Sequence, residues 1–250
     1  MTFFDATTNP FRGIIPNPEA LPSDAAQFQT TLSKALAAWK AEDYLVVWLE
    51  VPIAKSALIP IAVDAGFVFH HSGEDYLMLT HQLEPGAFIP AYSTHYIGAG
   101  GVVINDNDEI LVVSEKFRRN KDNPSYKLPG GALHQGEHIQ EAVAREVFEE
   151  TGVKANFERI VCFRHWHGYR YGKSDIYFIC RLSPVTQAIS MQEDEIEDCL
   201  WMPVAEYLAS DYVHHFNKLI VKAALDSPGV VPTAIEGYQN PESHEFFFPE

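Results

Sequence analysis

The chain has 250 residues, of which 46% are hydrophobic and 21% charged, and its formal net charge is −16. This composition is typical of a globular protein with room for two small domains, and it excludes a disordered or fibrous chain. The negative charge disfavours binding to a nucleic-acid backbone, and no apolar run approaches the roughly 20 residues that span a bilayer. The N-terminus has no secretory-signal pattern, and the 3 cysteines are widely spaced. We therefore expect a cytoplasmic protein with reduced thiols.

The first part of the chain predicts a small α/β domain over residues 1–92. Repeated prolines and the lack of periodicity make residues 1–22 an irregular arm. The pattern then predicts a helix, a buried strand, a second helix and a hairpin, over residues 23–40, 44–51, 56–66 and 67–81. A Pro/Gly-rich stretch at 83–92 marks the domain boundary.

The second part predicts another α/β domain over residues 93–228, followed by a tail over 229–250. It opens with two strands, 95–105 and 110–117, joined by a turn as a hairpin. The remaining elements are expected to be a helix at 137–151, strands at 153–165, 174–182 and 198–202, and helices at 203–209 and 214–226. Three successive phenylalanines close the tail, which indicates packing onto this chain or onto a partner subunit in a homodimer.

The most informative stretch is the predicted helix within residues 131–153. Three apolar residues at four-residue spacing form a stripe on it: Ile139, Val143 and Val147. At about 100° per residue, Glu146 and Glu150 lie only about 40° apart, and Glu150 falls within the apolar stripe. Clustered carboxylates repel one another and are stable together mainly around a hard cation such as Mg²⁺. A solvated acidic face is the alternative interpretation.

The same helix belongs to a longer pattern. The pattern consists of Gly131, five residues, Glu137, seven residues and then REVFEETGV at 145–153. It resembles the Nudix box at every specified position, and the chain is therefore similar to the Nudix hydrolases. The resemblance implies an α/β (α+β) fold in which a Nudix α/β/α sandwich with a mixed sheet follows a small α/β domain.

The resemblance also implies roles for the residues of the box. It makes Glu146, Glu149 and Glu150 catalytic residues that bind Mg²⁺ or Mn²⁺, with the carbonyl of Gly130 as a further ligand. Four residues would support the box: Gly131, Glu137, Arg145 and Gly152. The Arg145–Glu137 pair would hold the helix against its loop. The metal would polarise a diphosphate and help to activate the attacking water.

The flanking segments narrow the resemblance to a subgroup. Segments 44–80, 163–182 and 192–207 are similar to Nudix proteins with an N-terminal acetyltransferase-like domain, which include plant ADP-ribose/NADH pyrophosphatases and the antisense-fibroblast-growth-factor protein. This implies a small nucleotide diphosphate, ADP-ribose or NADH, as substrate and AMP as product. The first domain lacks a Gly-rich loop for acetyl-CoA, which argues against acetyltransferase activity. A Nudix-fold ligand sensor without turnover is the alternative.

Two further regions carry candidate residues. Glu193 and Glu195 lie in an acidic loop, where either could be the general base or a metal ligand. A solvated acidic loop explains them equally well. The predicted turn at 164–173 is rich in cations and aromatic rings, and Arg164, His167 and Lys173 are its candidates for binding the substrate. The alternative there is an aromatic cluster with surface cations.

Overall fold

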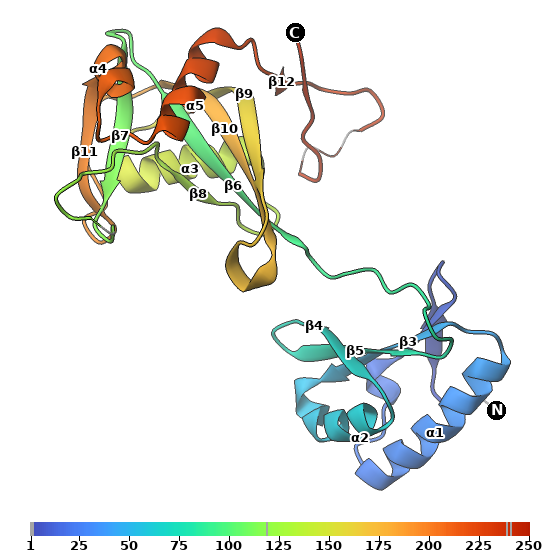
Figure 1. Ribbon diagram of the computed structural model, residues 1–250. Helices are drawn as coiled ribbons and strands as arrows, with labels where there is room; N and C mark the ends of the chain where they lie inside the picture. The colour runs from blue at the N-terminus through green and yellow to red at the C-terminus, as the bar shows by residue number, and fades with distance from the viewer. Residues whose placement is uncertain (1–2, 119, 239, 241) are drawn as a thin grey trace. The chain divides into compact units, whose positions relative to one another are not determined.

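The computed structural model describes residues 3–118, 120–238, 240 and 242–250. The chain divides into two compact units, Met1–Ser93 and Thr94–Glu250 (Figure 1). Each unit has its own hydrophobic core, so we describe each by itself. None of the helices in the described ranges is both long enough and apolar enough to cross a bilayer.

The first unit is a five-stranded sheet packed against helices. Its strands lie in the order β1-β2-β3-β5-β4, with β2 and β3 parallel and the other neighbours antiparallel. The strands are β1 (Ala6–Thr8), β2 (Gly13–Pro16), β3 (Val46–Pro52), β4 (Val68–Ser72) and β5 (Tyr76–Gln82). The helices are α1 (Ala25–Ala41) and α2 (Ile59–Asp64), with short 3₁₀ turns at Pro18–Ala20 and Ile53–Leu58. Buried residues of α1 repeat at spacings of four, three and four, and they pack on β3 in one core.

The prediction of an irregular arm at residues 1–22 was wrong for residues 3–22, the part that the structure describes. Residues there form β1 and β2, which pair with each other and add to the edge of the sheet. The turn between them is held by Asn9, whose side-chain oxygen accepts the backbone N–H groups of Phe11 and Gly13 at 3.0 and 2.9 Å. Strands of three and four residues are too short to show periodicity, and the proline of β2 is its last residue, so their pattern looked irregular.

The second unit is built around a mixed four-stranded sheet in the order β8-β6-β10-β9. Strands β6 and β10 are parallel, whereas β8 and β9 run antiparallel to their neighbours. The four strands are β6 (His95–Val103), β8 (Gly130–Ala132), β9 (Ala155–Trp166) and β10 (Ser174–Pro184). A second ladder joins β7 (Glu109–Glu115) to β11 (Ile196–Pro203).

The predicted hairpin between 95–105 and 110–117 is corrected by this topology. Both edges of β6 are already occupied, by β8 and β10, so no edge remains for β7. The two segments meet only next to the turn, through a bridge between Ile104 and Ile110. Strand β7 takes β11 as its ladder partner instead.

Alternating residues of the sheet belong to different cores. Val102 and Ile179 face one cluster, while their neighbours Val103 and Cys180 face the other. Helix α5 (His215–Asp226) buries its apolar side in the first cluster, and α3 (Ile139–Thr151) buries its own in the second. The sheet is thus covered by helices on both faces, with α4 (Val204–Ala209) beside α5 (Figure 1). This α/β/α sandwich is the expected fold.

The C-terminal tail packs onto its own unit. Gly229 adopts a φ of 66°, and the next residue, Val230, exchanges backbone hydrogen bonds with Ile160 at 3.0 and 2.9 Å. Strands β12 (Val231–Pro232) and β13 (Phe247–Phe248) then pair antiparallel. The ring of Phe247 lies 5.8 Å from that of Phe157 on β9. The sequence left open whether the tail packs onto this chain or onto a partner subunit, and in this structure Phe247 packs onto this chain.

Candidate active site

Helix α3 and strand β8 place the residues of the box. The helix ends at Gly152, which has a φ of 72° and donates its N–H to Phe148 O at 2.7 Å, the left-handed cap that glycine favours. The buried stripe of α3 includes Glu150, which is only 7% exposed. A carboxylate in that stripe is costly unless polar or positive groups meet it.

Glu150 is met by two such groups. One carboxylate oxygen accepts the backbone N–H of Gly130 at 3.0 Å, and the other lies 3.9 Å from Nζ of Lys127. Burial nevertheless raises the pKa of Glu150 to about 7, although Lys127 and the Gly130 N–H act to lower it. The positive charge around this carboxylate therefore does not fully offset its burial.

Arg145 organises the other acidic residues of the box. Its Nε and Nη2 donate to both carboxylate oxygens of Glu137 at 2.7 and 2.9 Å, and its Nη1 donates to Glu146 and Glu149, each at 2.9 Å. The hydrogen bonds from Arg145 are the main cause that lowers the pKa of Glu137 to about 2. Nη2 also reaches the carbonyl of Ala132 at 3.2 Å. One guanidinium thus ties the helix to the loop before it.

Two glycines of β8 make room for this arrangement. A Cβ on Gly131 would lie 2.6 Å from the carboxylate of Glu146, closer than any contact that a side chain tolerates. Gly130 has a φ of 152°, and a Cβ there would lie 2.4 Å from the carbonyl oxygen of Ala99. Gly130 therefore requires glycine, because backbone approaches it directly, whereas a side chain at position 131 would displace the Glu146 carboxylate.

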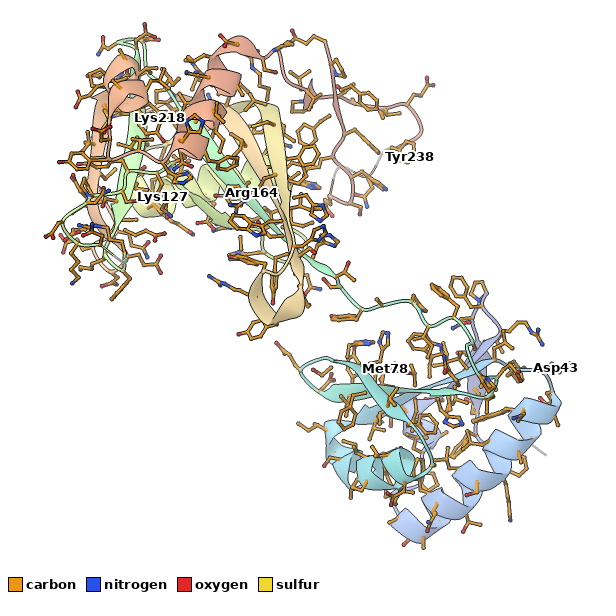
Figure 2. All side chains as sticks on the ribbon, viewed as in Figure 1. Asp43, Met78, Lys127, Arg164, Lys218 and Tyr238 are labelled. Carbon is orange, nitrogen blue, oxygen red and sulfur yellow. The ribbon has the colours of Figure 1, made fainter. Side chains whose placement is uncertain are left out.

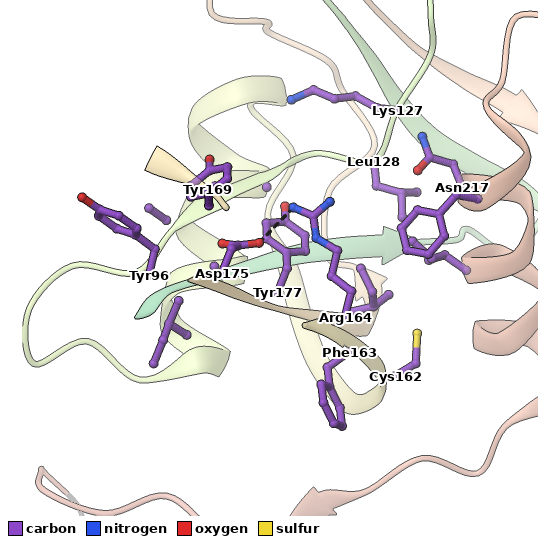
Figure 3. Close-up of a pocket in the computed structure, with 18 of the residues that line it drawn as sticks. Tyr96, Lys127, Leu128, Cys162, Phe163, Arg164, Tyr169, Asp175, Tyr177 and Asn217 are labelled. Carbon is purple, nitrogen blue, oxygen red and sulfur yellow. Dashed lines mark hydrogen bonds and ion pairs between the residues drawn. The ribbon is translucent and has the colours of Figure 1, made fainter. Parts of the chain in front are cut away.

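A cavity of about 730 Å³ opens beside these glycines. It is bounded by β8 and β6 on one side, by β9 and β10, and by the first turns of α5. Eight of its larger lining side chains are Tyr96, Glu115, Lys127, Arg164, Tyr169, Asp175, Tyr177 and Phe216. Its volume falls in the range of small-molecule and cofactor sites. Figure 3 shows Arg164 in the middle of it.

Arg164 is held by its neighbours on two strands. Its Nη2 lies 3.1 Å from Oδ2 of Asp175, a carboxylate that is only 4% exposed. Its guanidinium carbon also lies 4.9 Å from the ring centre of Tyr177 (Figure 3). It lies 5.3 Å from the ring centre of Trp166. Strand register explains the grouping, because Arg164 and Tyr177 are direct partners in the β9–β10 ladder. The Nε of Arg164 is buried and has no hydrogen-bond partner within the described chain.

The other two candidates for substrate binding lie outside the cavity lining. His167 makes a hydrogen bond through Nδ1 to the hydroxyl of Ser174 at 2.9 Å. The ammonium of Lys173 lies 5.3 Å from the ring centre of Tyr96, which does line the cavity. The structure thus brings Arg164 to the cavity and leaves His167 and Lys173 on the β9–β10 turn.

Glu193 and Glu195 lie in the loop before β11, and both are exposed. Their backbone carbonyls accept hydrogen bonds from Lys116, and neither residue lines the cavity. The cavity has instead an acidic residue that sequence reasoning missed, Glu115 at the end of β7, which pairs with Lys127. The sequence offered one indication of Glu115, which is that a charged residue ends the apolar run of β7.

The carboxylates predicted to bind a metal ion do not converge on one point in this structure. Within the described residues, no three His, Cys, Asp or Glu side chains form a group that could hold a metal ion. Glu146 and Glu149 both turn to Arg145, while Glu150 turns to Gly130. The oxygen donors of a hard cation are therefore present on one helix but are bonded to protein groups.

An α/β/α sandwich in which the carboxylate helix follows a glycine strand is the architecture that the resemblance to the Nudix box implied. Comparison with known proteins agrees. A family model described as NUDIX domain matches residues 94–223, and one described as Nudix hydrolase domain matches residues 4–83. The chain belongs to the Nudix hydrolase family, whose members are pyrophosphohydrolases.

Individual relatives extend across both units. Nudix hydrolase 2 of Arabidopsis thaliana is 40% identical over 199 residues, which cover 79% of this chain and 72% of that protein. Nudix hydrolase 8 of the same plant is 37% identical over 209 residues, covering 83% of this chain but 57% of its own length. The human protein named nucleoside diphosphate-linked moiety X motif 6 is 40% identical over 183 residues, covering 72% of this chain and 57% of its own length. The chain thus spans little more than half of two of these relatives.

Proposed function

We propose that the protein is a Mg²⁺- or Mn²⁺-dependent pyrophosphohydrolase that cleaves the diphosphate of a nucleoside-diphosphate-linked small molecule. ADP-ribose or NADH is the favoured substrate, and AMP is the expected product. The observation that carries the proposal is the position of the carboxylate helix. The neighbouring glycine strand, β8, lines the cavity of about 730 Å³, and Arg164 lines the same cavity.

The residues present fit a hard divalent cation. Glu146, Glu149 and Glu150 supply carboxylate oxygens and Gly130 supplies a carbonyl oxygen, which are the donors that Mg²⁺ prefers. The lack of a side chain at Gly131 lets the Glu146 carboxylate approach the backbone of β8, since a Cβ there would lie 2.6 Å from that carboxylate. When bound, the cation would polarise the diphosphate and help to activate water.

The chain's own cations and rings would bind the rest of the substrate. Arg164 is oriented by Asp175 and stacked near Tyr177, which fixes a positive guanidinium in the lining of the cavity for a phosphate group. Aromatic side chains from different elements line the cavity: Tyr96 on β6, Tyr169 in the β9–β10 turn and Phe216 on α5. These rings suit a base and a second planar or sugar moiety on either side of a diphosphate.

The choice of substrate rests on two similarities. The printed name of the human relative refers to a nucleoside diphosphate-linked moiety, and the proposal carries that chemistry to this chain. The flanking segments resemble the ADP-ribose/NADH subgroup. We also propose that the first unit is acetyltransferase-like and that the protein is a cytoplasmic homodimer. Glu193 or Glu195 remains our candidate for the general base.

A substrate panel with product analysis tests the proposal. ADP-ribose, NADH, NAD, FAD, CoA, dinucleoside polyphosphates and nucleoside triphosphates are incubated with and without Mg²⁺ or Mn²⁺. We expect AMP from ADP-ribose or NADH only with metal, and a loss of at least about 100-fold in the Glu146→Gln variant. Glu141→Gln is the matched control, because Glu141 is an exposed carboxylate on the same helix. Tight ligand binding without turnover across the panel would replace the proposal with a sensor.

A further inference from the structure

The N-terminus of α3 lacks a cap from its own sequence. Its N-cap residue is His138, which has extended backbone angles but makes no side-chain hydrogen bond to the first turn. The first N–H groups of a helix have no partner within the helix, so they must be satisfied from elsewhere. This matters here because the same helix carries Arg145 and the three box carboxylates.

The missing cap comes from the C-terminal tail. Oε1 of Glu245 accepts the backbone N–H of Ile139, the first residue of α3, at 2.6 Å. The same oxygen lies 3.9 Å from Nδ1 of His138. The Glu245 side chain is only 16% exposed, and its second oxygen is buried with no hydrogen-bond partner in the described chain. A negative group at this end of a helix also interacts favourably with the helix dipole.

The tail is anchored on both sides of this contact. Before it, Val230 is bonded to Ile160 of β9, and Thr233 N–H donates to Phe246 O at 2.8 Å. After it, Phe247 packs on Phe157, also on β9. A buried carboxylate between two such anchors loses little further freedom when it binds the helix, which favours a specific contact over a chance one.

The helix start is linked directly to the catalytic network. Glu137 lies two residues before Ile139, and its carboxylate holds Arg145, which holds Glu146 and Glu149. The backbone N–H of His134 donates to the same Glu137 carboxylate at 2.8 Å. Any fraying of the first turn of α3 would therefore move Glu137 relative to Arg145.

We propose that Glu245 is a positioning residue for the active site. By capping α3 from the tail, it fixes the helix start and with it the Glu137–Arg145 network that orients the box carboxylates. The inference rests on the proposed function for its catalytic consequence. The capping itself is independent of any substrate.

Three variants of Glu245 test the capping in the full chain. Glu245→Ala removes the acceptor, Glu245→Gln keeps an acceptor oxygen without the charge, and Glu245→Asp keeps the charge on a shorter side chain. Hydrogen exchange of residues 139–142 should accelerate about 5- to 10-fold in Glu245→Ala, the effect of losing one cap, and much less in Glu245→Gln. The control is Glu236→Ala, an exposed glutamate of the same tail. Unchanged exchange in Glu245→Ala would overturn the inference.

Mn²⁺ binding, followed by electron paramagnetic resonance, tests the positioning without turnover. We expect Glu245→Ala to weaken Mn²⁺ binding and to lower kcat by about 5- to 10-fold, with KM changed less than about twofold. In Glu245→Gln, Mn²⁺ binding and kcat should be close to those of the wild type. Faster exchange with unchanged Mn²⁺ binding would make Glu245 a purely structural cap and refute positioning. If Glu245→Ala does not fold, Glu245→Asp takes its place, because the shorter side chain should weaken the bond to the Ile139 N–H, and Glu245→Gln remains the near-wild-type reference. Wild-type protein that binds Mn²⁺ but hydrolyses nothing would refute the proposed function, not this inference.

Discussion

The two units bury different kinds of side chain. In the described part of the first unit, the buried polar side chain is Thr80, and the rest of its core is apolar. The second unit buries Glu150 and Asp175, both ionisable, besides three uncharged polar residues. Burying a charge is costly unless it is paired or binds a cation. In Figure 2, Lys127 and Arg164, which pair with these two carboxylates, belong to the second unit.

The concave surfaces of the two units differ in the same way. A groove of about 230 Å³ in the first unit is lined mainly by Ile53, Ile59, Leu77 and neighbouring residues, with Glu74 as its acidic residue. The cavity of the second unit is about three times larger and contains acidic, basic and aromatic side chains together. The contrast indicates that the chemistry belongs to the second unit and that the first contributes an independently packed body.

The strongest test of this contrast compares one buried polar side chain from each unit. We expect Glu150→Gln to lower kcat by at least about 100-fold, because a ligand contributes more than the 10- to 100-fold typical of the groups that orient ligands. The amide oxygen can still accept the Gly130 N–H, so the fold should persist. Thr80→Val, the counterpart in the first unit, should change kcat less than about twofold. Steady-state kinetics measures both, and equal effects would contradict the contrast.

A smaller effect is expected from the residue that organises the carboxylates. Arg145→Lys keeps the charge but cannot contact Glu137, Glu146 and Glu149 at once, since an ammonium lacks the planar fork. We expect metal affinity or kcat to fall about 10- to 100-fold. Arg181→Lys, in the 3.6 Å pair with Glu158 elsewhere in the unit, is the control. Activity measured against metal concentration compares the two variants. Wild-type activity and metal dependence in Arg145→Lys would exclude a role for Arg145 in orienting the carboxylates.

The cation that lines the cavity, Arg164, should affect binding more than chemistry. Arg164→Lys loses stacking near Tyr177 and the fixed geometry with Asp175, so we expect KM to rise about 10-fold with kcat changed less than about threefold. Arg159→Lys, on the same strand but outside the cavity lining, is the matched control. A fall in kcat with unchanged KM would instead place Arg164 at the reacting atoms.

The smallest effect is expected from removing the first unit. Because each unit has its own core, residues 94–250 should fold alone and retain kcat within about threefold of the full chain. Circular dichroism and steady-state kinetics measure the two outcomes. A folded but inactive second unit would show that the first unit contributes to the site and would end the contrast.

Local spacing predicted what lies within a single element. The place of Glu150 in the apolar stripe follows from helical periodicity, and its burial confirms that placement. The Asp175–Arg164 pair could not be predicted, because it depends on the register of β9 against β10. The hairpin error has the same origin, since insertion of β8 beside β6 depends on a pairing far along the chain. Glu245 caps a residue 106 positions away, beyond any local pattern.

Tyr177 has a consequence for how sequences of this kind can diverge. Its ring fills the space above β6 that side chains at Gly98 and Gly100 would otherwise occupy, and its hydroxyl lies 2.6 Å from where a Gly130 Cβ would be. Gly100 depends on this tyrosine alone, since every close atom that its Cβ would meet belongs to the Tyr177 ring. Gly98 and Gly130 also face backbone, because their added Cβ atoms would lie 2.8 Å from the Gly131 carbonyl oxygen and 2.4 Å from that of Ala99. A chain that lacks the ring would therefore be free to lose the glycine at position 100, while those at positions 98 and 130 would remain fixed by the approach of the strands.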